Sequence, residues 1–145
     1  SSDLQSGDKV FIQMLAPGSL STDSISGLAT EVVTGVDNDG TVGIFATNET
    51  AANEILSASN DGADLASYAD LVVVGFDAGD AQKAGVRNEY FLGSIVQDSY
   101  FMGYRSVLLA NEALGGSAVS DVTSAGVFYD HENMDDDGVA NLLYD

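Results

Sequence analysis

The feature that most constrains this chain is a series of short, nearly unbroken apolar runs separated by longer amphipathic stretches. The runs lie at 10–15, 42–46, 71–76 and 92–96, and a later candidate strand lies at 125–129. Continuous rather than alternating apolar runs are typical of parallel strands covered on both faces. We therefore expect an α/β fold, with a three-layer, doubly wound, mostly parallel sheet and right-handed crossovers.

The stretches between the runs have helical patterns. The segment 50–59 places alanines and aliphatic residues on one stripe, and Asp80 is positioned to cap a helix over 81–87. Asp98 or Ser99 can cap a longer helix, which ends at Gly115-Gly116 and carries Phe101, Tyr104 and Leu108 on one side. The tail 133–145 reads as a loop with a short helix. No linker divides the chain, so residues 1–145 are expected to form a single domain.

Charge is the strongest feature of the composition. Four Lys and Arg oppose 23 Asp and Glu, which gives a net charge of −19. Such a field repels phosphate backbones and anionic membrane surfaces, so nucleic acid is excluded as a partner. There are no cysteines, and no apolar run approaches the ~18 residues of a membrane span. The start of the chain lacks the pattern of a signal peptide, so we expect a mature, trimmed or partial chain.

Polar residues follow three successive runs. Asn48 comes after the second run, Asp77 after the third and Gln97 after the fourth. The carboxyl ends of parallel strands meet at one edge of a sheet, where ligands bind in such folds. Two carboxamides and a carboxylate supply donors and acceptors suited to a polyhydroxylated ligand. Alternatively, Asn48 and Asp77 simply cap the helices that follow.

Other candidate sites are weak. His131 is the only histidine, and the sequence has no Gly-x-Ser-x-Gly motif that would supply a nucleophilic serine beside it. The sequence also has no glycine-rich phosphate-binding loop. The acidic segments 37–40 and 135–138 lack calcium-loop spacing and read as turns. Lys83 and Arg87 are expected on an ordinary solvated helical face. We therefore expect no catalytic residue, metal site or cofactor.

Five motifs in constant order resemble the type I periplasmic sugar-binding proteins of ABC transporters, in particular the ribose-binding group. They cover residues 41–145 and comprise Ile44-Phe45-Ala46-Thr47-Asn48-Glu49, Val73-Val74-Gly75-Phe76-Asp77-Ala78-Gly79, Leu92-Gly93-Ser94-Ile95-Val96-Gln97-Asp98, Met102-Gly103-Tyr104, and the ending Asn133-Met134-Asp135-Asp136 with Leu142-Leu143-Tyr144. Each motif alone is common, whereas their shared order is specific.

The resemblance implies a two-lobed protein that closes on a sugar and catalyses nothing. In that family, positions matching Asn48, Asp77 and Gln97 hydrogen-bond sugar hydroxyls from the second lobe. Tyr100 is a further candidate, because an aromatic ring can stack on a sugar face, although it can equally pack between lobes. The helix at 99–114 would belong to the first lobe, and the strand around Val127 would return through the hinge.

The resemblance also implies what is missing. The chain corresponds to the C-terminal half, shortened by one βα unit, and Thr22, Asp23 and Ser24 stand where the family often has a ligand-contacting arginine. Expected partners are therefore a monosaccharide or polyol, the missing N-terminal lobe or a second copy of the chain, and a transporter permease. The parent protein would be exported, as a periplasmic protein or a cell-surface lipoprotein. The alternatives are the effector domain of a LacI-type repressor, which shares the fold, and a flavodoxin-like or receiver-like domain, for which the phosphate loop or acidic pocket is missing.

Overall fold

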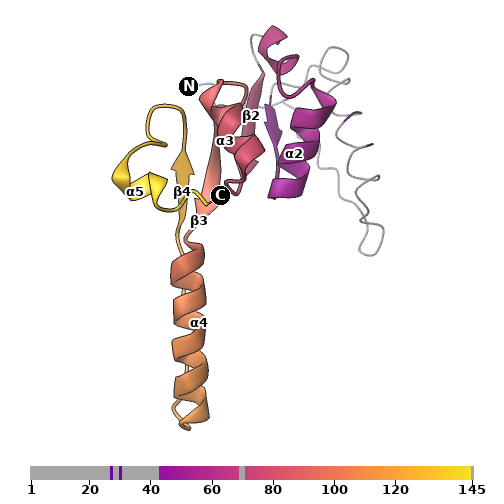
Figure 1. Ribbon diagram of the computed structural model, residues 1–145. Helices are drawn as coiled ribbons and strands as arrows, with labels where there is room; N and C mark the ends of the chain where they lie inside the picture. The colour runs from indigo at the N-terminus through magenta and orange to yellow at the C-terminus, as the bar shows by residue number, and fades with distance from the viewer. Residues whose placement is uncertain (1–26, 28–29, 31–42, 69–70, 145) are drawn as a thin grey trace, which may run out of the picture.

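The computed structural model describes residues 27, 30, 43–68 and 71–144 (Figure 1). The strand expected at 10–15 and the acidic turn at 37–40 lie outside these residues. The elements in order are β1 (Gly43–Phe45), α2 (Glu49–Ala58), a 3₁₀ turn η1 (Leu65–Ser67), β2 (Val72–Phe76), α3 (Asp80–Arg87), β3 (Gly93–Gln97), α4 (Ser99–Leu114), β4 (Gly126–Tyr129) and α5 (Asp137–Ala140).

The four described strands form one sheet in the order β1-β2-β3-β4. The pairs β1–β2 and β2–β3 are parallel, while β4 runs antiparallel to β3, from Ser94↔Tyr129 to Gln97↔Gly126. The α/β class and the mostly parallel sheet are therefore confirmed. Each of the three parallel strands is followed by a helix, as crossover connections between parallel strands require.

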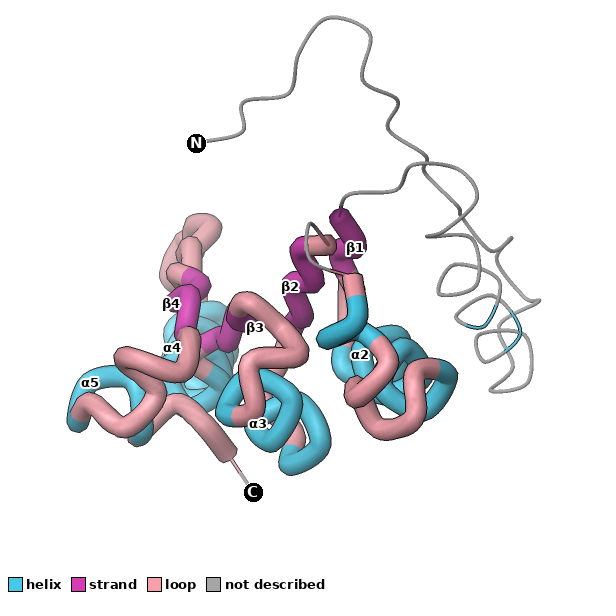
Figure 2. The backbone as a smooth tube through the Cα atoms, turned by 90° about the horizontal axis from the view of Figure 1, so that it is seen from above, coloured by secondary structure: helices cyan, strands magenta, loops and turns pink. Residues whose placement is uncertain are grey.

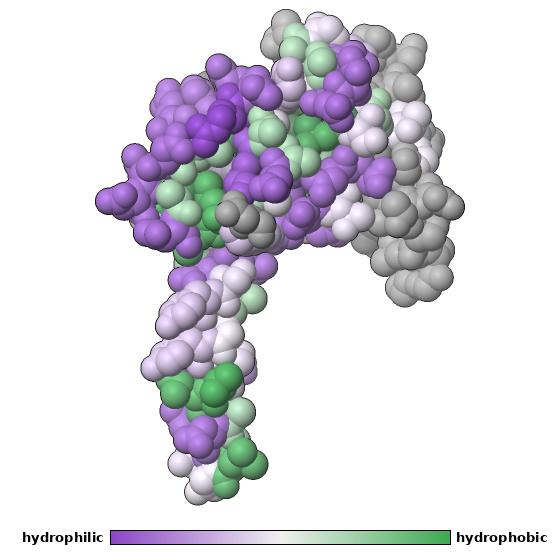
Figure 3. Space-filling view, viewed as in Figure 1, coloured by the Kyte–Doolittle hydropathy of each residue, from purple (hydrophilic) through white to green (hydrophobic). Residues whose placement is uncertain are grey.

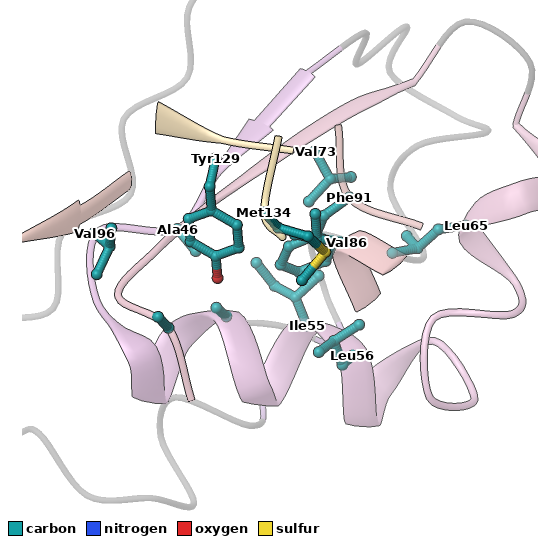
Figure 4. Close-up of a cluster of buried hydrophobic side chains, with 12 residues drawn as sticks. Ala46, Ile55, Leu56, Leu65, Val73, Val86, Phe91, Val96, Tyr129 and Met134 are labelled. Carbon is teal, nitrogen blue, oxygen red and sulfur yellow. The ribbon is translucent and has the colours of Figure 1, made fainter. Parts of the chain in front are cut away.

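The core lies on one face of the sheet. Helices α2 and α3 pack against each other and against β2 and β3 (Figure 2). The buried cluster joins Ile55 and Leu56 of α2 and Val86 of α3 to Val73 and Tyr129 of the sheet (Figure 4). Alternate residues of each strand point into this cluster, as the two-residue period of a strand requires.

The other face of the sheet differs from the expected coverage on both faces. Phe45, Val72 and Phe128 project there and remain 54 %, 44 % and 41 % exposed. Helices α2 and α3 cover the opposite face. The continuous apolar runs thus correspond to strands that are apolar on both faces. Within the described residues, helices cover only one of these faces.

Helix starts follow the expected capping chemistry at two of three positions. The Oδ1 atoms of Asn48 and Asp98 accept hydrogen bonds from the backbone N–H groups of Ala51 and Phe101, at 2.9 and 2.8 Å. The expected cap at Asp80 is wrong, because Gly79 occupies the N-cap position and Asp80 is the first helical residue. There its negative charge still complements the positive end of the helix dipole.

Helix α4 extends away from the body as an arm, and the chain returns alongside it to β4 (Figure 1). None of its residues is buried. Tyr100 and Leu114 are 83 % and 89 % exposed, and apolar side chains show on the surface of the arm (Figure 3). No helix in the described segments is long and apolar enough to span a membrane.

Candidate ligand-binding site

The structure brings Asn48, Asp77 and Gln97 to one edge of the sheet. Phe45 pairs with Val74, so Asn48 and Asp77 each lie three residues beyond a matched pair. Phe76 pairs with Ile95, so Asp77 and Gln97 lie one and two residues beyond the next matched pair. Since neighbouring strands are about 4.8 Å apart, the three residues follow one another across three adjacent strand ends.

Asn48 serves as the helix cap that the alternative interpretation anticipated. Its Oδ1 accepts the Ala51 N–H, and its backbone is extended, as an N-cap residue requires. The side chain is exposed. Capping uses the oxygen of the carboxamide, whereas the Nδ2 hydrogens donate to no group in the described residues. Asn48 can therefore cap α2 and still offer two donors to a ligand.

Asp77 lies at the centre of the edge in an uncommon backbone conformation. Its φ is +78°, in the left-handed region, which costs about 1–3 kcal/mol for a residue with a side chain. The Asp77 N–H donates to the Ile95 carbonyl at 2.7 Å. Its Oδ2 accepts the Glu49 N–H at 3.2 Å, which ties the end of β2 to the start of α2. The second carboxylate oxygen, Oδ1, accepts no hydrogen bond from the described part of the protein.

Two hydroxyl groups meet at the backbone oxygen of Asp77. Ser94 Oγ donates to it at 2.8 Å and Tyr129 Oη at 3.1 Å. Ser94 and Tyr129 are both fully buried. Burial raises the pKa of Tyr129 to about 12. The Tyr129 hydroxyl therefore stays protonated, and remains a donor, at neutral pH.

The C-terminal segment also reaches this edge. The Tyr144 hydroxyl donates to Glu49 Oε2 and accepts the Ala78 N–H, both at 3.4 Å. Burial is the main cause of a raised pKa for Tyr144. The Glu49 carboxylate lies so close to Gly79 that a side chain at Gly79 would overlap it. Glu49 is thus held beside Asp77 by two hydrogen bonds, one to the Asp77 carboxylate and one from the Tyr144 hydroxyl.

Lys83 and Arg87 both contact this C-terminal segment, from a helical face on which the Arg87 side chain is still 58 % exposed. Lys83 Nζ donates to the Tyr144 carbonyl at 2.7 Å and pairs with Asp80 at 2.9 Å. Arg87 makes two 2.9 Å hydrogen bonds to Asp135, which lower the pKa of that carboxyl group. The partners lie 48 and 61 residues away, so sequence spacing could not reveal them. The one feature of the sequence that pointed to a role for this segment was its Leu142-Leu143-Tyr144 ending, which resembles the ending of the sugar-binding family.

Gln97 and Tyr100 lie where β3 passes into α4. Gln97 is the last residue of β3, is half-buried, and makes no side-chain hydrogen bond to described residues. Tyr100, in the first turn of α4, stacks on Tyr104 with ring centroids 6.2 Å apart and an interplanar angle of 3°. The two rings are nearly parallel, and Tyr100 remains 83 % exposed. The roles of Asn48, Asp77, Gln97 and Tyr100 in ligand binding stay predictions.

This edge of the sheet combines several negatively charged carboxylates with carboxamide groups that can donate hydrogen bonds. Glu49, Asp77 and Asp98 supply carboxylates, and the two carboxamides supply donors. An anionic ligand would be repelled, whereas a neutral polyol can donate to the carboxylates and accept from the amides. Among the described residues, no group of three or more acidic or histidine side chains is placed to hold a metal ion.

This arrangement of strands and helices is that of one lobe of the type I periplasmic sugar-binding proteins of ABC transporters. The chain is similar to an ABC transporter solute-binding protein from Agrobacterium vitis with bound D-fucose, with a TM-score of 0.73 and 24 % identity over 85 % of this chain and 41 % of that one. It is similar to a carbohydrate transporter solute-binding protein from Agrobacterium radiobacter in complex with D-arabinose, with a TM-score of 0.72 and 25 % identity over 85 % and 40 %.

A third solved structure, described as an ABC transporter, LacI family transcriptional regulator from Brachyspira murdochii, has a TM-score of 0.71 and 32 % identity over 83 % of this chain and 40 % of that one. The chain thus spans about two fifths of the length of these proteins. No protein-family model matches the chain, and no curated protein matches it.

Proposed function

We propose that this chain forms one side of a binding site for a neutral monosaccharide or polyol, within the substrate-binding component of an ABC importer. The observation that carries the proposal is the placement of Asn48, Asp77 and Gln97 on three adjacent strand ends, with hydrogen-bonding groups that the described residues leave unused. The bound D-fucose and D-arabinose of the two similar proteins support a ligand of this class. The site binds and releases its ligand without catalysis.

One lobe supplies only part of the contacts. If each hydrogen bond contributes about 1 kcal/mol net, three of them do not offset an association cost of about 4 kcal/mol or more. We therefore expect the 145-residue chain to bind such solutes weakly. A micromolar affinity for the chain alone would contradict this one-sided site.

The test is a titration of the isotopically labelled chain with D-arabinose, D-fucose and myo-inositol, followed by amide chemical shifts. Asn48→Asp keeps the capping oxygen and removes the two amide donors, so it is expected to abolish the solute-dependent shifts without destabilising α2. Asn60→Asp adds the same charge beyond the other end of α2, where φ of +54° suits either residue, and should bind like the wild type. Shifts that are absent from the wild type, or equally strong in Asn48→Asp, would contradict the proposed site.

The partner of this chain follows from α4. Residues 99–120 contain a single Arg and a single Glu within a chain of net charge −19, and they expose Tyr104, Val107 and Leu114. Exposed apolar surface of this kind marks a contact region. We propose that it packs against the N-terminal lobe of the parent protein, which would be exported and would deliver its solute to a permease.

Light scattering of the chain at several concentrations distinguishes the possible partners. Co-expression with a separately encoded N-terminal lobe should give a stable one-to-one complex that Val107→Glu weakens. Self-association of the chain, weakened by the same substitution, would instead favour a second copy as the partner. A strict monomer that binds neither would contradict a contact role for α4.

A second candidate is the effector domain of a LacI-type regulator, which the 32 % identity to the Brachyspira murdochii protein favours. The strongly acidic surface would then need a separate basic segment to bind DNA. A helix-turn-helix preceding this segment in the parent reading frame, together with operator binding, would establish this function in place of transport.

A further inference from the structure

The backbone of Asp77 is held by hydrogen bonds with residues that are distant in the sequence. Its backbone oxygen accepts from Ser94 on β3 and from Tyr129 on β4, and its N–H donates to Ile95 on β3. A residue with φ of +78° persists only where its surroundings determine it. The contacts from β3 and β4 do this, because they fix the N–H on one side of the Asp77 Cα and the carbonyl oxygen on the other.

A third buried side chain completes the group. Gln82 of α3 is fully buried, and its Oε1 lies 3.2 Å from Ser94 Oγ, while its Nε2 has no hydrogen-bond partner among the described residues. One serine hydroxyl carries one proton, so Ser94 cannot donate to both Gln82 Oε1 and the Asp77 oxygen. With the carboxamide turned over, Nε2 donates to Ser94 and the Ser94 proton goes to Asp77. The chain of donors then runs from Gln82 through Ser94 to Asp77.

Gly75 shows how closely this group is packed. A Cβ atom at Gly75 would lie 2.7 Å from Gln82 Oε1 and 2.9 Å from Ser94 Oγ. The strand that carries Asp77 therefore passes directly over the two side chains. Because Ser94, Gln82 and Tyr129 are buried, water does not compete for the Asp77 oxygen.

We propose that Ser94 and Tyr129 are positioning residues, whose hydroxyls hold Asp77 in its left-handed conformation and so present its carboxylate at the sheet edge. This inference rests on the proposed function for its effect on ligand, while its conformational part stands on the unliganded protein. Neither hydroxyl contacts the ligand. Both act through the peptide group of Asp77, with Gln82 orienting Ser94.

The experiment uses the 145-residue chain and five variants. Ser94→Ala and Tyr129→Phe are made singly and together. The controls are Ser67→Ala, whose hydroxyl bonds only to the Asp64 carbonyl, and Tyr90→Phe, whose hydroxyl has no hydrogen bond within the described residues. The first readout is the set of ¹³Cα and ¹³Cβ shifts of Asp77 without solute, which report φ and ψ. The second is the initial slope of the Asn48 amide shift against D-arabinose concentration, which is proportional to affinity when binding is weak.

The double variant is expected to lose the left-handed signature of Asp77 and to reduce the slope at Asn48 by about fivefold or more, while both controls match the wild type. A merely structural role would lower the melting temperature and leave both readouts unchanged, and that result overturns the proposal. A changed Asp77 with an unchanged slope overturns it as well. If the wild type shows no response to solute but Asp77 changes in the double variant, the conformational role stands and the proposed function fails.

Discussion

A substitution at Gly75 tests how closely β2 packs over the buried side chains of Gln82 and Ser94. We predict that Gly75→Ala lowers the free energy of unfolding by about 1–3 kcal/mol, because its methyl group would overlap buried polar atoms of Gln82 and Ser94. Gly103→Ala, in the middle of α4, meets nothing within 4 Å and should be neutral or stabilise the helix by up to about 1 kcal/mol. Urea unfolding followed by circular dichroism compares the two, and equal effects would contradict the packing argument.

Tyr129 gives stability a dependence on alkaline pH. Burial raises its pKa to about 12, against about 10 in an unfolded chain. Because the pKa of Tyr129 is higher in the folded protein, the stabilisation that the protonated side chain contributes is complete below pH 10. It is lost as the pH rises from 10 through 12. We predict a loss of roughly 2–3 kcal/mol over this range.

Urea titrations at several pH values check this prediction in the wild type and in Tyr129→Phe. The variant lacks the ionisable group, so its stability should fall less steeply above pH 10. Tyr90→Phe is the matched control and should follow the wild type. Parallel curves for wild type and Tyr129→Phe would show that Tyr129 does not titrate in this way.

Among the elements, α4 depends most on its own local interactions. It buries no residue, so its cap carries more weight than in a helix held by packing. We predict that Asp98→Ala removes about 1 kcal/mol from the first turn of α4, whereas Asp98→Asn keeps the capping oxygen and the stability of that turn. Hydrogen exchange of the Phe101 amide, which donates to Asp98 at 2.8 Å, measures this. Equal protection in both variants would contradict it.

The sequence predicted the elements well where local chemistry determines them. Each described strand began and ended within about one residue of its apolar run, and the caps at Asn48 and Asp98 followed from residue type. The prediction that Asp80 caps α3 was wrong because Gly79, with its extended backbone, takes the N-cap position one residue earlier. A polar residue beside a glycine leaves two candidate caps, and local propensity does not choose between them.

The site was only partly predictable for a different reason. The strand-end positions of Asn48, Asp77 and Gln97 could be predicted, because each comes within two residues of the end of an apolar run. Their role in ligand binding stays a prediction. Ser94 and Tyr129 could not be located in this way, because they reach Asp77 across 17 and 52 residues and read as ordinary strand residues. The same holds for Tyr144 and Glu49, which are 95 residues apart. Contacts of this range depend on strand pairing, which periodicity does not specify.

For the molecule as a whole, charge and shape divide the chain into two regions. Among the described residues, the body carries most of the acidic side chains and all of the buried cluster. The arm and its return segment are nearly uncharged and expose apolar side chains. High net charge on the body opposes association between like-charged molecules, whereas the nearly neutral arm adds little to that repulsion.

The antiparallel pairing of β3 with β4 makes the arm a removable insertion. Gln97 and Gly126 face each other as the last pair, and none of the twelve core residues lies between them. We predict that replacing 98–125 with Asn-Gly leaves a two-residue hairpin and a sheet that melts cooperatively with its four strands, which circular dichroism would show. Loss of that transition would mean the arm is needed for folding. If the shortened protein folds, evolution could exchange whatever the arm meets without redesigning the sheet and the helices packed on it.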